Sequence, residues 1–196
     1  MSMALELVRD IETTPGGARL VYHALALRPG PSDIGQEELR AGTAAELGTL
    51  ASLFRDLFLD HYRDIEFGPV IAGAIFELRL QRPPEAIFVR DGYLNVHLPA
   101  GAGHLHLGIA LSSANASLDT SGAIERSRRC SRAALFEGHA PGELGPRTWG
   151  LRLWNGAGQQ MITFFFDSGT GARRFAELRD RYASPGATTM WPSAST

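Results

Sequence analysis

Three of the six histidines in this chain lie within ten residues of one another, at positions 97, 104 and 106. Neutral imidazole is a common ligand for zinc, iron and other transition metals. Three imidazoles that face the same way could hold one ion and leave a position open for water or substrate. The sequence therefore suggests a mononuclear metal site at His97, His104 and His106, with zinc or iron as cofactor and a small molecule as substrate.

Strand alternation predicts that these histidines share one face of a small sheet. Asp91-Gly92 between two apolar runs indicates a two-residue hairpin turn, which sets Arg90 opposite Tyr93. The small residues of 99–103 suit a second turn. Alternation then places Arg90, Tyr93 and Asn95 beside the histidines. The opposite face would be aliphatic, with Ile87, Val89, Leu94, Val96, Leu98, Leu105, Leu107 and Ile109.

Two groups outside this stretch are candidate catalytic residues. Glu77 lies in a run that reads as a strand, and it could serve as a fourth ligand or a general base if that strand joins the same sheet. Arg79 would then share the histidine face. His61 ends the expected helix 36–62, where it could either enter the pocket or stabilise the helix end.

Other interpretations of the polar face stay open. Antiparallel sheets often expose one side, so the histidines could be solvated surface residues. The protein could instead be a non-enzymatic carrier of haem or another carboxylate-bearing ligand. A histidine would then be the axial ligand, and Arg79, Arg90 or Arg152 would pair with carboxylates. The candidate ligand-binding residues overall are Arg79, Arg90, Tyr93, Asn95 and Arg152. A structural interaction module is a third interpretation. Two known histidine motifs on strands are incomplete here. One needs a carboxylate a few residues after His106, where none is present, and the other needs a third alternating histidine at the position of Gly108.

The overall pattern predicts an α+β fold: a mostly antiparallel sheet of about six strands with helices packed on one face. We expect helices over 36–62, 123–137 and 171–182, and a loop over 112–122. Hairpins are expected over 4–27, where the second run could also be helical, and over 148–166. Residues 1–184 would form one domain, followed by a flexible tail over 185–196.

Composition narrows the function classes. The 196 residues carry a formal net charge of −2, so no strong positive field would recruit nucleic acid or anionic membrane. All nineteen basic residues are arginine, which excludes lysine Schiff-base chemistry. Cys130 is the only cysteine, so no intrachain disulfide can form. Without a signal peptide or a long apolar run, we expect a cytoplasmic protein without membrane segments. Its partner would be a small-molecule ligand, and a homodimer is left open.

Overall fold

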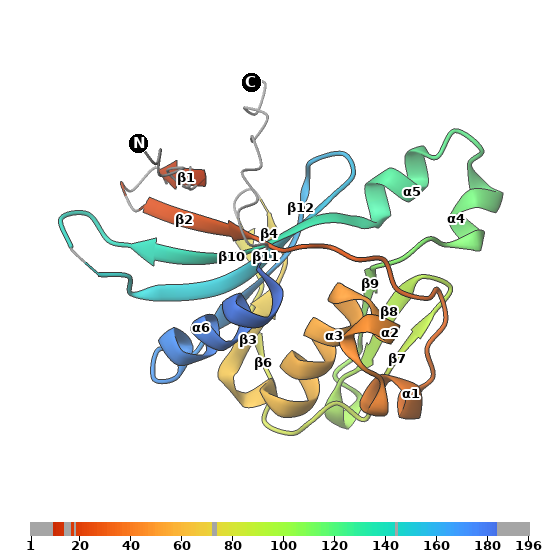
Figure 1. Ribbon diagram of the computed structural model, residues 1–196, viewed down its shortest axis with the longest axis horizontal. Helices are drawn as coiled ribbons and strands as arrows, with labels where there is room; N and C mark the ends of the chain where they lie inside the picture. Colours follow the sequence, from red (N-terminus) through yellow and green to blue (C-terminus); the bar gives the residue numbers. More distant parts are fainter. Residues whose placement is uncertain (1–9, 14–16, 18, 72–73, 144, 184–196) are drawn as a thin grey trace, which may run out of the picture.

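The computed structural model describes residues 10–13, 17, 19–71, 74–143 and 145–183, and its fold is α+β as expected (Figure 1). The helices are α1 (Gln36–Ala41), α2 (Ala44–Leu47), α3 (Thr49–Arg55), α4 (Ser113–Leu118), α5 (Ala123–Arg128) and α6 (Gly171–Tyr182), with short helical turns η1 (Asp56–Asp60), η2 (Tyr62–Asp64) and η3 (Pro99–Gly101). The strands are β1 (Asp10–Thr13), β2 (Arg19–Ala24), β3 (Ile65–Gly68), β4 (Val70–Ile71), β5 (Ala74–Ile75), β6 (Leu78–Arg79), β7 (Ala86–Arg90), β8 (Tyr93–His97), β9 (His104–Gly108), β10 (Cys130–His139), β11 (Thr148–Asn155) and β12 (Gln160–Phe166).

The described strands form a large sheet, a separate small sheet, and a two-stranded pair of β4 with β5. The large sheet has the order β1-β2-β10-β11-β12-β3-β6, and its pairings are antiparallel. The small sheet has the order β7-β8-β9. Figure 1 shows α6 and α3 on one side of the large sheet, and the small sheet standing beside the α1–α3 segment. The histidine strands are therefore not part of the main sheet.

The expected helix over 123–137 is wrong for most of its length. Helix α5 ends at Arg128, and β10 begins at Cys130 and runs between β2 and β11 at the centre of the large sheet. Ala133, Ala134, Leu135 and Phe136 are successive residues, and each is at most 2% exposed. A strand that is buried on both faces loses the polar–apolar alternation by which a strand is recognised in sequence.

The expected helix over 36–62 is broken into short pieces. Thr43 caps the start of α2 with a capping box, in which its hydroxyl oxygen accepts from the Glu46 N–H and its own N–H donates to the Glu46 carboxylate. Gly48 then takes φ +77°, which ends α2 and starts α3. The loop expected over 112–122 contains α4. By contrast, α6 occupies the expected range 171–182.

The two sheets share one apolar core. It contains the inward residues of β10–β12, the buried face of α3 and η1, the apolar stripe of α6, and the aliphatic face of the small sheet. The hairpin expected over 148–166 is present, and in it Leu151 pairs with Phe164, both fully buried. The opposite face of the large sheet carries a smaller cluster of Tyr22, Ala134, Phe136 and Trp154.

The N-terminal hairpin is confirmed where it is described, since β1 pairs with β2. Residues 4–9 and the expected tail 185–196 lie outside the described residues. Among the helices that are described, none has the length and apolar character required to cross a bilayer.

Candidate functional site

The small sheet presents the polar surface on which the candidate site lies. Its first turn has φ +47° at Asp91 and +77° at Gly92, as a two-residue hairpin of this type requires. The register sets Arg90 opposite Tyr93 and Val89 opposite Leu94, so the predicted pairing is confirmed. The aliphatic set faces the core: Ile87, Val89, Leu94, Val96, Leu98 and Leu107 are at most 4% exposed. Leu105 and Ile109 are half-buried beside them.

The three histidines share the outward face, as the alternation predicts. His97 pairs with His104 across β8 and β9, and Asn95 pairs with His106. The ring centroids of His97 and His104 are 4.4 Å apart, and those of His104 and His106 are 6.0 Å apart. Phe88 of β7 meets the His97 ring edge to face at 5.4 Å. We call the outward side chains of Tyr93, Asn95, His97, His104 and His106 the histidine face.

Hydrogen bonds at both ends of β9 explain the close approach of the first pair. The Leu98 N–H donates to the Gly103 carbonyl, and the Ile109 N–H donates to the Gly92 carbonyl. These bonds fix the phase of the ladder, so His97–His104 and Asn95–His106 are pairs that are not directly hydrogen-bonded. In such pairs the Cα atoms are only about 4.5 Å apart, compared with about 5.5 Å in the bonded pairs. The backbone therefore brings the two imidazoles together.

One end of the histidine face is closed by α4 and α5. The buried Asn115 accepts a hydrogen bond from the Tyr93 hydroxyl at 3.0 Å and donates to the Glu125 carboxylate at 2.8 Å. The Arg128 guanidinium donates to the same Asn115 oxygen at 3.3 Å. Sequence reasoning missed these three residues, because it expected 112–122 to be a loop and 123–137 to be one continuous helix.

Asp91 fastens α4 to the hairpin turn. Its carboxylate accepts hydrogen bonds from the backbone N–H groups of Ser113 and Ala114 and from the hydroxyls of Ser112 and Ser113. These bonds, led by the Ser113 N–H, hold the pKa of Asp91 below its usual range. The open part of the histidine face is therefore the end that carries the histidines.

Glu77 and Arg79 do not share the histidine face, contrary to the expectation. Arg79 lies in β6, at the edge of the large sheet, and its guanidinium contacts Glu66 at 2.7 Å and Asp167 at 2.9 Å. Glu77 is exposed just before β6. Residues 81–84 connect β6 of the large sheet to β7 of the small sheet and do not join neighbouring strands. The side-chain alternation of β7–β9 therefore does not predict which way Glu77 and Arg79 face.

His61 belongs to a buried charge network at α6. Its Nε2 lies 2.9 Å from Arg174 Nη1, and the same guanidinium contacts Asp64 at 2.9 Å. Burial lowers the pKa of His61, and the Arg174 charge lowers it further. This histidine links the end of η1 to α6 and takes no part in the histidine face.

The remaining ligand-binding candidates are also separated. Arg152 lies on the far face of the large sheet, where it contacts the Tyr22 hydroxyl and the Thr163 hydroxyl. Arg90 is exposed beside Asp33 at 3.5 Å. Tyr93 and Asn95 do lie on the histidine face, although the Asn95 amide is occupied by the Tyr93 carbonyl at 2.7 Å.

No preformed three-ligand metal site exists among the described residues. Across those ranges, no group of three His, Cys, Asp or Glu side chains is gathered closely enough to hold an ion. The sequence-based hypothesis of three convergent imidazoles with Glu77 or His61 is therefore only partly met. The histidines share a face, but the acid and the fourth histidine are elsewhere.

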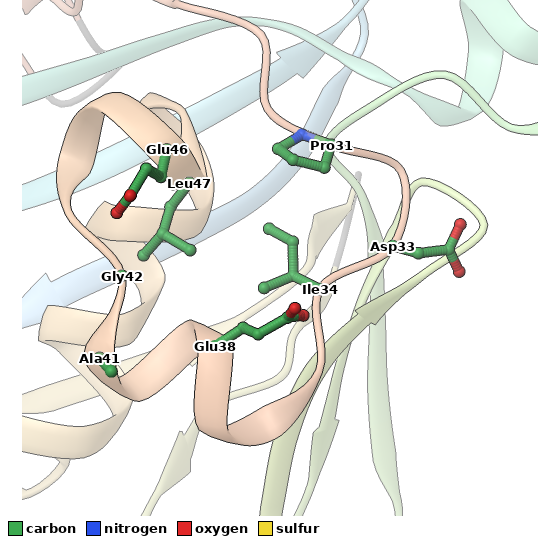
Figure 2. A pocket seen from close by; sticks show the side chains of 8 residues that line it. All are labelled: Pro31, Asp33, Ile34, Glu38, Ala41, Gly42, Glu46 and Leu47. Atoms are coloured by element: carbon green, nitrogen blue, oxygen red, sulfur yellow. The ribbon is translucent and has the colours of Figure 1, made fainter.

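The structure also contains an open hollow of about 480 Å³ between α1, α2 and the preceding loop (Figure 2). Its two helix carboxylates already have partners: Glu38 accepts from the Gly35 N–H, and Glu46 accepts from Thr43. Figure 2 shows the Asp33 side chain directed away from Ile34 and Leu47. The acidic groups thus stabilise helix starts, and the hollow offers no convergent polar set for a ligand.

Comparison with known proteins assigns the family. Residues 32–177 match the model of a family of unknown function, DUF7676, and because this match covers most of the chain, the protein belongs to that family. Neither the curated proteins nor the solved structures include a match to this chain. The matched range contains the small sheet, α4 and α5.

Proposed function

We propose that the histidine face binds a divalent transition-metal ion, zinc or iron, through the imidazoles of His97 and His104. The observation that carries this proposal is the 4.4 Å separation of their ring centroids on directly paired strands. Neutral imidazole is a natural ligand for both metals. His106 stands next to this pair, with its ring centroid 6.0 Å from that of His104.

The surroundings support an ion that remains accessible. His104 and His106 are exposed, and the chain has no charged residue between Asp91 and Asp119. A bound ion would keep open positions for water or a small molecule, on which it would act as a Lewis acid. Since Glu77 and His61 lie elsewhere, the proposal assigns no general base, and the function proposed is metal binding with small-molecule access.

The alternative, a carrier of haem or another carboxylate-bearing ligand, receives less support from the geometry. It requires arginines beside the histidines and an apolar wall. Arg79 is paired with two carboxylates, and Arg152 is on the opposite side of the large sheet. A visible absorption band in the purified protein would nevertheless identify haem directly.

Metal titration tests the proposal. Purified metal-free protein would be titrated with Zn²⁺ by calorimetry and with Co²⁺ by visible absorption. We expect His104→Ala to weaken binding by roughly tenfold or more, which is about 1.4 kcal/mol, and His104→Ala with His106→Ala to abolish it. His139→Ala is the matched control, because His139 lies in β10 away from this face. Unchanged binding in the double variant would refute the site.

A further inference from the structure

Strand β9 is an open edge of the small sheet. The ladder phase fixed by Leu98–Gly103 and Gly92–Ile109 turns the backbone groups of Leu105 and Leu107 toward β8. The N–H and C=O groups of His104 and His106 therefore point outward. In the described part of the chain, a backbone bridge on the outer edge of β9 joins Gly108 to Arg129, and it lies beyond both histidines.

The other edge of the same sheet is covered. Val89 of β7 exchanges backbone hydrogen bonds with Ile34, both at 2.9 Å, and α1 packs beside it. Natural sheets usually guard an open edge with lysine, proline, an inward charge or a bulge. β9 has none of these, since its sequence is His-Leu-His-Leu-Gly and its pairing with β8 is regular.

We infer that β9 pairs antiparallel with β9 of a second copy of this chain, about a two-fold axis at Leu105. In this register the outward groups of His104 bond those of His106 of the partner subunit, and the reverse pair forms by symmetry. The register is the one that fits the edge. A centre at His106 would bring in Gly108, which already bridges Arg129, and a centre at His104 would bring in Ala102, outside the strand.

A second copy suits this edge better than a charged peptide would. The stretch from Gly92 to Leu118 carries no formal charge, so the strand neither repels its own copy nor attracts an ionic partner. Leu105 is half-buried against the core, and in this register it meets Leu105 of the partner subunit directly. The apolar contact and the four backbone groups on each strand are thus self-complementary.

Pairing would also complete the metal site. The outward face would become continuous across six strands, and His106 of the partner subunit would stand beside His104, next to His97. Each ion would then gain a third imidazole from the other chain, which fits the lack of a three-ligand group among the described residues of a single chain. This metal step depends on the proposed function, whereas the strand pairing does not.

The oligomeric state tests the pairing. Sedimentation equilibrium of the full chain should show a dimer. His106→Pro should sediment as a monomer that circular dichroism shows to be folded, because the substitution removes only an outward N–H. His106→Lys provides a second edge-blocking variant. His106→Ala keeps the N–H and should remain a dimer. A monomeric wild type, or dimers that persist in both blocking variants, would overturn the pairing. A monomer that binds an unrelated peptide along β9 would also overturn the pairing.

Mixing two inactive variants tests the shared site separately. His106→Ala retains His97 and His104, while the double variant His97→Ala with His104→Ala retains His106. Each alone should lose tight Zn²⁺ binding, and their heterodimer should regain one intact site. If the mixture dimerises but binds no Zn²⁺, the shared site fails while the pairing stands. If wild type binds Zn²⁺ as a monomer, the proposed function stands and this inference fails.

Discussion

The large sheet and the small sheet use their two faces differently. The inward face of the large sheet meets α3, η1 and α6 and buries a cluster of aromatic rings, with Phe164 within 6 Å of Phe54, Phe58 and Phe67 by ring centroid. The small sheet adds an aliphatic face to the same core, but its histidine face is open. The comparison indicates that stability is concentrated in the aromatic cluster, and that the histidine face is freer to carry chemistry.

The strongest test of this difference is the same truncation on each sheet. Phe164→Ala removes a fully buried ring and should lower the free energy of unfolding by about 3–5 kcal/mol. Phe88→Ala, a half-buried ring beside His97, is the matched control and should cost about 1 kcal/mol. Urea denaturation would measure both. Equal losses of unfolding free energy would mean that both sheets contribute equally to stability, contrary to the comparison.

The buried carboxylate of Asp56 provides the next largest effect on the large-sheet side. It is 1% exposed and accepts hydrogen bonds from the Tyr182 hydroxyl and from the guanidinium groups of Arg55 and Arg181. Asp56→Asn should cost about 1–3 kcal/mol of unfolding free energy, because these donors lose a charged acceptor. Asp60→Asn, in the same η1 turn but exposed, should change stability by less than about 0.5 kcal/mol. A reversed order would argue against a structural role for Asp56.

A smaller effect is expected from His61 as the pH changes. Its folded pKa is lowered from 6.5, first by burial and then by Arg174, so the unfolded chain binds this proton more readily. The free energy of unfolding should therefore fall as the pH drops through 6.5 and into the lowered range. His61→Gln should flatten this dependence in urea titrations across that interval. Identical slopes in wild type and His61→Gln would contradict the assignment.

The histidine face should show the smallest stability change. His97→Ala, measured in metal-free protein at a concentration that keeps it monomeric, should alter the free energy of unfolding by no more than about 0.5 kcal/mol. Its ring lies on the surface side of β8, away from the aliphatic core. A loss as large as that of Phe164→Ala would show that this face is part of the structural core.

The hairpin of the small sheet could be predicted from the sequence because its determinants are local. Asp91-Gly92 has the conformational freedom that the turn needs, and the alternating residues fix which side is buried. The parity of the histidines follows from those two facts alone. The last hairpin, expected over 148–166, is also present, and the structure shows Leu151 and Phe164 on its core face.

The failures concern contacts between distant segments. Cys130–His139 contains good helix formers, and its strand conformation depends on pairing with β2 and β11, which lie far away in sequence. Asn115 and Glu125 close the histidine face only because α4 folds back onto Asp91. Neither the pairing of β10 nor the packing of α4 onto Asp91 produces a periodic pattern in the sequence.

The sequence by itself determined the α+β class, the register of the Asp91-Gly92 hairpin and the common face of His97, His104 and His106, because turn chemistry and strand alternation act over a few residues. Only the tertiary structure decided that these strands form a sheet of their own, and that Glu77, Arg79 and His61 lie elsewhere. The physical reason is that strand partners are selected by burial and backbone pairing across long stretches of chain, where no local preference specifies the neighbour.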